Sequence, residues 1–408
     1  MDLRPYQQRC IADARALYRD GKRAICIVAP CGAGKTIIGS AIASSAVARG
    51  SVLWLAHRHE LIEQARAKLP PAVRVATIQG LLASGERPPG DVVVYDECHH
   101  LMAGVWRHLT DHYHASLRIG LTATPERADG QPLGDIFDGL VVAASYSELL
   151  AGGWIVPCDV IAPGARGTTL AAPAAEATRE HAAGQRAIVY CSTVAEAQDV
   201  ARALWPDAVA VDGETPDEMR ADAVDAFRAG RFRVLTNVYV FSEGFDAPET
   251  SVCVLARGAG HASTYLQMCG RALRPAPGKS RALLVDLCGC VHEHGWPTED
   301  RDYSLDGTPI RRRGEKKPVV WQCRGCGRCY QAAPADRRCP ACGVRLPEPK
   351  QIAVARRRLA RQERAAHASP EERAAALARF RSIAAERGYK PGWAAVQFKA
   401  RFGHWPRA

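Results

Sequence analysis

Short runs of β-branched and apolar residues alternate with longer, helix-compatible stretches along most of this 408-residue chain. Five such runs lie between residues 24 and 125, and five more lie between residues 187 and 287. Strands that alternate with helical stretches are typical of parallel sheets covered by helices. We therefore predict an α/β fold of two parallel-sheet lobes in tandem, at residues 1–150 and 158–290.

The strand rhythm stops near residue 290, and the rest of the chain is rich in positive charge. Residues 311–408 carry 24 Lys and Arg against 7 Asp and Glu, whereas residues 1–310 carry 30 against 36. Such asymmetry suggests an appendage that prefers polyanions, although charge runs often form only a solvated surface. We predict a small cysteine-rich unit at residues 318–348 and a basic helical tail at residues 350–408, in which Pro370 begins a helix.

The cysteine-rich unit has the spacing of a zinc site. Two C-x2-C pairs lie twelve residues apart, and they consist of Cys323, Cys326, Cys339 and Cys342. Two such pairs place four thiolates tetrahedrally around Zn²⁺, and the metal supplies about 10 to 16 kcal/mol of apparent binding free energy. Cys329 also pairs with Cys326 in a C-x2-C, and we favour Cys329 as the spare thiol. The alternative is a set of unligated thiols.

Residues 24–43, AICIVAPCGAGKTIIGSAIA, are expected to form a strand, a glycine-containing turn and a helix. This is the context of a phosphate-binding loop. The backbone N–H groups that would wrap the phosphates belong to Gly32, Ala33 and Gly34. Lys35 would reach the terminal phosphates, and Thr36 would coordinate Mg²⁺. The usual first glycine of such a loop is Ala29 here, which removes some backbone freedom at that point.

The stretch VVVYDECHHL, residues 92–101, ends a strand-like run with two carboxylates. An enzyme that hydrolyses nucleoside triphosphates needs one carboxylate to hold Mg²⁺ and another to draw a proton from water. We assign these roles to Asp96 and Glu97, respectively. A zinc site in residues 98–100 is disfavoured, because neighbouring side chains on an extended segment point to opposite faces. We expect His99 to hydrogen-bond towards the next motif instead.

Nine segments, in order, resemble the motifs of superfamily 2 helicases and translocases, in the DEAH-like branch of DNA repair helicases and restriction-enzyme motor subunits. They are LRPYQ (3–7), APCGAGKT (29–36), LAHRHELIEQA (55–65), TIQGL (77–81), DECH (96–99), GLTATPERADG (120–130), VYCSTVAEA (189–197), NVYVFSEGFDAP (237–248) and QMCGRALRP (267–275). The resemblance covers residues 3 to about 290. It implies two RecA-like lobes that close on ATP.

The resemblance also implies roles in nucleotide binding. Gln7 is similar to the glutamine that reads the adenine edge, and Gly244 and Asp246 resemble a motif that responds to nucleotide. Arg271 and Arg274 lie three residues apart, on one face of a helix, and would point across the cleft at the γ-phosphate. A planar guanidinium suits the oxyanion charge of phosphoryl transfer. The alternative is that both arginines form structural ion pairs.

Several positions match those that touch the phosphates of one nucleic-acid strand in the family. These are Arg58, Thr77, Gln79, Thr193 and Thr236. Their side chains suit sequence-independent contacts. We expect an ATP hydrolase that moves along DNA, at a single strand or a junction. The alternatives are a duplex translocase that does not separate strands and a non-hydrolysing nucleic-acid clamp.

No run approaches the roughly 18 apolar residues that a membrane span needs, and the first residues lack a signal-peptide pattern. We therefore expect a soluble, cytoplasmic protein with no membrane partner. Its expected cofactors are ATP, Mg²⁺ and Zn²⁺, and the sequence leaves its protein partners undetermined.

Overall fold

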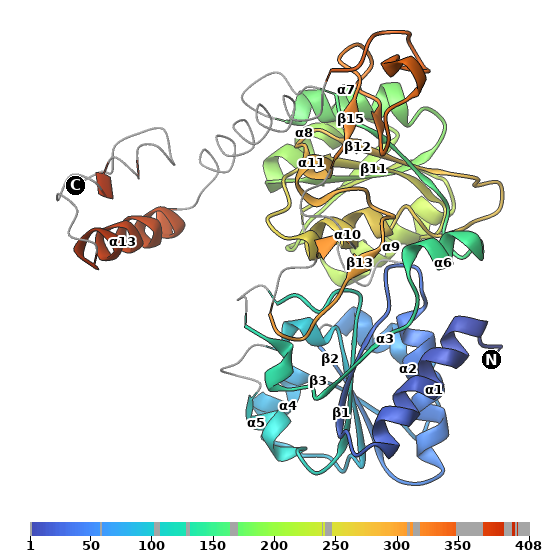
Figure 1. Cartoon of the computed structure of the whole chain (residues 1–408), viewed down its shortest axis with the longest axis vertical. Helices are drawn as coiled ribbons and strands as arrows, with labels where there is room; N and C mark the ends of the chain where they lie inside the picture. Colours follow the sequence, from blue (N-terminus) through green and yellow to red (C-terminus); the bar gives the residue numbers. More distant parts are fainter. Residues whose placement is uncertain are drawn as a thin grey trace.

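The computed structural model describes most of the chain as two α/β lobes, one above the other, with a small unit on the upper lobe (Figure 1). The described residues are 2–57, 59–101, 107–127, 131–163, 170–238, 240, 247–307, 311–312, 319–347, 370–386, 394–395 and 398. The predicted α/β fold with two tandem parallel-sheet lobes is confirmed.

The lower lobe, lobe 1, contains a sheet with strand order β3-β2-β4-β5-β1-β6, in which all neighbours are parallel. Its strands are β1 (Ala24–Val28), β2 (Val52–Ala56), β3 (Arg74–Thr77), β4 (Val92–Asp96), β5 (Leu117–Thr122) and β6 (Gly139–Val142). Its helices are α1 (Pro5–Arg19), α2 (Lys35–Val47), α3 (His59–Arg66), α4 (Ile78–Ser84) and α5 (Arg107–His112), with short 3₁₀ turns η1 (Cys98–His100) and η2 (Leu133–Asp135).

The upper lobe, lobe 2, contains a second all-parallel sheet, with order β7-β12-β11-β8-β10-β9. Its strands are β7 (Cys158–Ile161), β8 (Arg186–Cys191), β9 (Ala208–Val211), β10 (Val234–Asn237), β11 (Thr250–Ala256) and β12 (Ala282–Asp286). Its helices are α7 (Ala171–His181), α8 (Val194–Ala203), α9 (Asp217–Arg228), α10 (Ala262–Gly270) and α11 (Cys290–His294).

Helices cover both faces of each sheet, so the central strands are apolar throughout. β1 and β2 are buried at every position. Helix α2 packs very closely on the sheet at Gly39, where a β carbon would lie 2.6 Å from the ring of Trp54. A larger residue at Gly39 would push α2, and the phosphate loop that precedes it, away from the sheet.

Among the described residues, two segments connect the lobes. The first connection includes α6 (Tyr146–Ala151) and leads into β7. The second is residues 296–307, which return from lobe 2 to lobe 1. There, Asp300 accepts hydrogen bonds from the backbone N–H (2.9 Å) and hydroxyl (2.7 Å) of Ser147, and Leu305 packs against the core of lobe 1. Two connections restrict the ways in which the lobes can move apart.

The cysteine-rich unit is attached to the edge of lobe 2. It contains the hairpin β15 (Trp321–Gln322) and β16 (Cys329–Tyr330). The backbone N–H of Ala162, just after β7, donates to Gly327 O (2.8 Å), and the Gln322 amide donates to Ala162 O. Cys329 is buried in the apolar cluster that continues into lobe 2. These contacts fix the orientation of the unit on the lobe.

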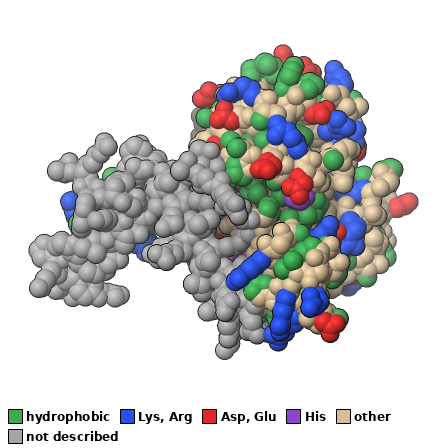
Figure 2. Space-filling view, turned by 90° about the horizontal axis from the view of Figure 1, so that it is seen from above, with side chains coloured by type: hydrophobic (Ala, Val, Ile, Leu, Met, Phe, Trp, Pro, Cys, Tyr) green, Lys and Arg blue, Asp and Glu red, His purple; other side chains and the backbone are tan. Residues whose placement is uncertain are grey.

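Within the tail, the structure describes α13 (Pro370–Glu386), which begins at the predicted residue. Most of the predicted tail, residues 350–408, lies outside the described residues. No helix in the described part of the chain is long and apolar enough to cross a membrane. Seen from above, the molecule shows several groups of Lys and Arg side chains, with few Asp and Glu among those in the lower part of the view (Figure 2).

Candidate nucleotide-binding site between the lobes

A pocket of about 330 Å³ lies where the lobes meet. The predicted nucleotide-site residues that line it are Gly32, Gly34, Lys35, Thr36, Asp96, Glu97, Arg271 and Arg274. The first six come from lobe 1. The two arginines come from lobe 2, but α10 ends at Gly270, so they lie in the turn after the helix and not on one face of it as predicted. The structure thus brings the predicted phosphate loop, carboxylates and arginines into one pocket, which we call the nucleotide pocket.

The phosphate loop connects β1 to α2 and has the backbone that its glycines allow. Gly32 (φ +92°) and Gly34 (φ +76°) adopt left-handed conformations, which glycine reaches without steric cost. Ala33 is fully buried, and its carbonyl accepts hydrogen bonds from Tyr6 and Gln7. Ala29, at the place of the usual first glycine, continues the strand, because its N–H donates to Thr122 O (2.8 Å). No special backbone freedom is needed there.

Lys35 faces both carboxylates at the end of β4. Its Nζ lies 3.0 Å from Asp96 Oδ1 and also pairs with Glu97. Burial alone would lower the pKa of Lys35, but the two carboxylates raise it, so the ammonium stays charged. Burial is the main cause that raises the pKa of Asp96, and the nearby charge of Glu97 adds to it. Glu97 itself has a left-handed backbone (φ 53°), an uncommon conformation for this residue type that directs its side chain into the pocket.

The donor set fits Mg²⁺. Thr36 offers a hydroxyl, and Asp96 offers a carboxylate, and both line the nucleotide pocket. Oxygen ligands of this kind, completed by phosphate and water, are those that Mg²⁺ prefers.

One wall of the nucleotide pocket is formed by Arg4 and Trp154. The Arg4 guanidinium carbon lies 5.8 Å from the centre of the Trp154 ring, and Trp154 packs on Tyr6 with ring centres 4.5 Å apart. Sequence reasoning missed Trp154. The sequence feature that could have revealed it is a lone aromatic residue in the stretch GGWIVP, which connects the lobes. An aromatic face beside a phosphate loop is suited to stack on a nucleobase.

Gln7, predicted to read the base, lies behind this wall. It is only 2% exposed, its Oε1 accepts from Arg4 N (3.0 Å), and its Nε2 donates to Ala33 O (3.0 Å). In this structure the amide therefore holds the start of α1 against the phosphate loop. Its predicted contact with adenine would require these hydrogen bonds to change.

His99 connects the two lobes beside the carboxylates. Its Nδ1 lies 3.0 Å from Thr122 Oγ1, and its Nε2 lies 3.4 Å from the side-chain nitrogen of Gln267 in α10. The expected link from His99 to the following motif is present in the structure. Because Gln267 belongs to lobe 2, a movement of α10 would change the contact of Gln267 with His99, which lies just after β4.

Two family models match the chain. "Type III restriction enzyme, res subunit" matches residues 1–88 and 73–127, in lobe 1, and "Helicase conserved C-terminal domain" matches residues 171–276, in lobe 2. The two matches fall on the two lobes that form the nucleotide pocket. The chain belongs to the superfamily 2 helicases. Within them it falls in the restriction and repair branch.

Relatives of this superfamily 2 helicase include a "51.5 kDa protein" of a Lactococcus phage, 28% identical, which covers 78% of this chain and 77% of the relative. The DNA 3'-5' helicase XPB of Kineococcus radiotolerans is 30% identical and covers 74% of this chain. The chain spans only 61% of that relative. The Mycobacterium smegmatis helicase Lhr, solved with ssDNA and AMP-PNP, has a similar fold, with a TM-score of 0.55 at 18% identity over 74% of this chain and 49% of its own.

The predicted nucleic-acid contacts of this helicase are only partly placed. Thr77 and Thr193 lie at helix starts, where their hydroxyls accept from Gly80 N (3.0 Å) and Glu196 N (3.1 Å). Gln79 is exposed. Three further predicted site residues lie outside the described residues, namely Arg58, Gly244 and Asp246.

The prediction for Thr236 needs correction. This residue is 0% exposed, and its hydroxyl donates to Ala197 O (2.7 Å). It therefore ties β10 to α8 inside lobe 2 and does not face a nucleic acid. The sequence pattern gave no sign of this, because the same strand end can point a threonine inward or outward.

The four predicted zinc ligands of this helicase converge. All four sulfur atoms lie within 4.8 Å of one another, with Cys323 and Cys342 3.4 Å apart and Cys326 and Cys339 3.6 Å apart. Four thiolates at about 2.3 Å from Zn²⁺ have such separations. Burial raises the pKa of Cys339, but the Tyr330 hydroxyl and backbone N–H groups outweigh it and lower the pKa to about 6. Cys329 points away, towards Gly327 O.

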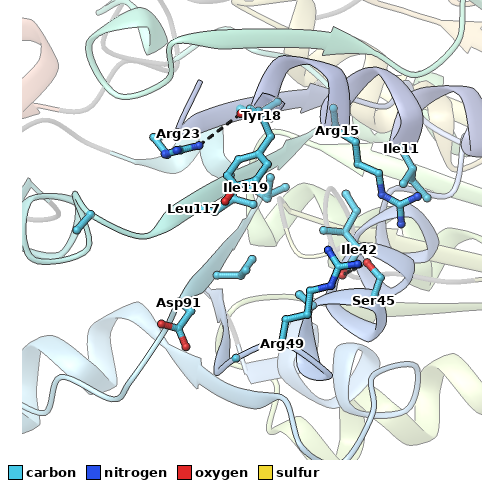
Figure 3. Close-up of a pocket in the computed structure, with 16 residues that line it drawn as sticks. Ile11, Arg15, Tyr18, Arg23, Ile42, Ser45, Arg49, Asp91, Leu117 and Ile119 are labelled. Atoms are coloured by element: carbon cyan, nitrogen blue, oxygen red, sulfur yellow. Dashed lines mark hydrogen bonds between the residues drawn. The ribbon is translucent and has the colours of Figure 1, made fainter. Parts of the chain in front are cut away.

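A second pocket of lobe 1 also has a volume of about 330 Å³, but none of the predicted site residues line it (Figure 3). It lies at the opposite edge of the sheet, where β1 and β5 begin. Its apolar lining residues include Ile25 and Ile119. Arg15, Arg23 and Arg49 also line it (Figure 3). Because both pockets have the same volume, only the predicted residues that line the nucleotide pocket distinguish it from this one.

Proposed function

We propose that this protein is an ATP-dependent helicase or translocase that acts on DNA and couples ATP hydrolysis to movement along one strand. The observation that supports it most is the nucleotide pocket, in which Lys35 of lobe 1 and Arg271 and Arg274 of lobe 2 share one cavity. A relative that is 30% identical over 74% of this chain is a DNA 3'-5' helicase. That likeness favours DNA as the polymer.

ATP binding would bring both lobes onto the same triphosphate. The phosphate loop and Lys35 would bind the β- and γ-phosphates, while Arg271 and Arg274 stabilise the charge that spreads over the γ-phosphoryl oxygens. Mg²⁺ held by Thr36 and Asp96 would neutralise part of that charge. Glu97 would orient the attacking water and accept its proton. Release of phosphate then weakens the attraction between the lobes, which allows them to reopen.

A structural Zn²⁺ in the cysteine-rich unit is the second cofactor that we propose. The support is the convergence of Cys323, Cys326, Cys339 and Cys342. The segment 319–347 has only a small apolar cluster of its own, formed around Leu346. Metal binding would therefore supply most of its folding free energy.

We propose that Thr77 and Gln79 of lobe 1 and Thr193 of lobe 2, which are exposed or half-buried, contact the phosphates of DNA. From the motif match alone, Arg58 remains a proposed phosphate contact, and Gly244 and Asp246 remain proposed nucleotide-binding residues. A single strand or a junction is the proposed substrate, because sequence-independent backbone contacts suit movement along a strand.

The decisive experiment measures ATP hydrolysis with and without single-stranded DNA for the wild type and for Glu97→Gln. We expect stimulation by DNA in the wild type, and in Glu97→Gln we expect retained ATP binding without hydrolysis. No stimulated hydrolysis by the wild type would favour the non-hydrolysing clamp. Strand displacement with 3′- and 5′-tailed duplexes then gives polarity, and hydrolysis without displacement would favour a duplex translocase.

A further inference from the structure

A groove of about 750 Å³ follows the edge of lobe 2 at which its parallel strands begin. Residues at the starts of β7, β8, β11 and β12, and just before β10, line it. No residue lines both the groove and the nucleotide pocket, although Pro248 and Pro275 of the pocket are next in sequence to Glu249 and Ala276 of the groove. The groove is therefore a neighbouring but distinct cavity.

The groove is rich in positive charge. Its cationic residues are Arg186, Arg233, Lys279, Arg281 and Arg328, and its acidic residues are Asp159 and Glu249. We call the four arginines the groove arginines. Three of them stand where β12, β8 and β10 begin, and neighbouring strands are about 4.8 Å apart, so the row extends over roughly 15 Å. A row of this length matches several phosphates of an extended strand better than one small anion.

Hydrogen bonds within lobe 2 position these guanidiniums but use only some of their N–H donors. Arg281 pairs with Asp159 through Nε (2.8 Å) and Nη2, and Arg233 pairs with Asp207 through Nη2 alone. Arg186 donates to a carbonyl through Nη2. A guanidinium has five N–H donors, so each keeps some for a ligand. Exposed ion pairs of this kind contribute little energy, and phosphate can compete with them.

Lys279 contributes charge to the groove but no spare donor. Its ammonium donates to the carbonyls of Pro248 (3.0 Å), Thr250 (2.5 Å) and Arg274 (2.6 Å). It therefore fixes the loop that carries Arg281 next to β11. Substitution of Lys279 would disturb that loop, and we leave it unchanged in the test below.

The cysteine-rich unit supplies the fourth groove arginine, Arg328. Arg328 is exposed, and its backbone bridges Ile161 of β7 and accepts from Cys323 N (2.9 Å). Its neighbour Gly327 accepts from Ala162 N. The cysteines of the four-sulfur cluster lie before and after Arg328 in sequence, so folding of the cysteine-rich unit determines the position of this guanidinium. The cysteine-rich unit and lobe 2 thus form the groove together.

An exposed aromatic ring lies near the far end of the row. Trp205 is 76% exposed, and it stands two residues before Asp207, the partner of Arg233. Stacking of a base on such a ring is worth about 1 to 3 kcal/mol in proteins that bind single strands. Cationic groups that follow a backbone, combined with a ring for bases, are the usual features of a single-strand site.

We propose that this groove binds single-stranded nucleic acid outside the nucleotide cleft, with the groove arginines on its phosphates and Trp205 against a base. The inference rests on the proposed function, because it gives the nucleic acid on which the motor acts a second binding surface, at the strand ends of lobe 2 opposite to Thr193. It also gives the cysteine-rich unit a role, which is to position one wall of that groove.

The test compares the wild type with the triple variant Arg233→Gln, Arg281→Gln and Arg328→Gln. Arg202→Gln is the matched control, because Arg202 is an exposed arginine of lobe 2 that pairs with Asp199 (2.5 Å) outside the groove. Fluorescence anisotropy with labelled oligo(dT) of about 20 nucleotides, longer than a site of about 4 to 16, measures affinity over a range of salt. We expect the slope of log K against log salt to fall by about 2 in the triple variant, because each phosphate that an arginine neutralises contributes about 0.7.

The control should keep the wild-type slope, and ATP hydrolysis without DNA should be unchanged in every variant. Trp205→Ala should weaken oligo(dT) binding about tenfold, and Trp205→Phe should restore most of it. If the triple variant does not fold, Arg328→Gln alone, at an exposed residue with no ion pair among the described residues, should lower the slope by about 0.7.

An unchanged slope in the arginine variants would overturn the inference, as would a loss confined to duplex DNA. These outcomes differ from failure of the proposed function, which would appear as a wild type that neither binds DNA nor shows stimulated hydrolysis.

Discussion

Gly270 of lobe 2 and Cys31 of the phosphate loop approach each other so closely that no side chain fits at Gly270. A β carbon there would lie 2.7 Å from Cys31 Sγ and closer still to Cys31 Cβ. Gly270 is the last residue of α10, and Arg271 follows it directly. This contact therefore sets how near the arginines of lobe 2 come to the phosphate loop.

Gly270→Ala is expected to reduce kcat for ATP hydrolysis by about 10²-fold, because a displacement of about 1 Å at a reacting centre has that effect. Cys31→Gly should rescue it, since it removes the Cβ that clashes. Cys31→Ala should not, because it keeps that Cβ. Steady-state hydrolysis of the two double variants provides the comparison, and equal rescue by both would contradict this account.

Lys35→Ala should destabilise lobe 1 in addition to abolishing hydrolysis. It would leave Asp96 and Glu97 buried without their cation, and loss of one partner of a buried pair costs about 3 to 5 kcal/mol. Burial raises the folded-state pKa of Asp96 and the Lys35 charge lowers it, so removal of Lys35 raises this pKa further and the folded variant binds protons more readily than its unfolded state. Stability is then gained below the folded pKa and lost as pH rises through it.

The deficit in thermal midpoint of Lys35→Ala against the wild type should therefore shrink as the pH is lowered from 8 towards 5. Thermal unfolding across that range is the measurement. A deficit that stays constant with pH would mean that the missing packing of the lysine stem, and not the carboxylate charge, causes it.

Arg271→Ala and Arg274→Ala should each lower kcat, by as much as about 10³ to 10⁵ for an arginine that contacts the transferring phosphoryl group. The KM for ATP should change far less, because this charge develops in the transition state. Lysine at either position should restore little, since it lacks the planar, forked donors of arginine. A large rise in KM with kcat unchanged would place the arginine on the bound nucleotide only.

Much of this arrangement could be predicted from the sequence, because motif residues sit at strand ends and parallel strands align those ends. All strands predicted from apolar runs are present, whereas the edge strands β6 and β7 were missed. The orientation of a side chain was harder to predict. Thr236 turns inward and Gln7 binds backbone, and both depend on packing between elements that no local pattern records.

Trp154 is the clearest case of a residue that only the fold reveals. It lies between the lobes in sequence, yet it lines the nucleotide pocket beside Arg4. We expect Trp154→Ala to raise the KM for ATP about tenfold with little change in kcat, because stacking on the base stabilises bound substrate and transition state alike. Trp154→Phe should retain most of the affinity. Energy transfer from tryptophan to a fluorescent ATP analogue should fall in both variants, and unchanged transfer would place the base elsewhere.

The cysteine-rich unit, for which we propose a zinc ion, provides a test that separates a ligand from a buried thiol. Cys326→Ser should lower bound zinc, measured by metal analysis, from one ion per chain to almost none, because Cys326 lies in the four-sulfur cluster. Cys329→Ala should keep the ion, since the Cys329 side chain is buried against lobe 2 and lies outside that cluster. It should still lower stability by about 1 kcal/mol through the small cavity that it leaves. Loss of zinc in Cys329→Ala, with retention in Cys326→Ser, would reverse the assignment of the spare thiol.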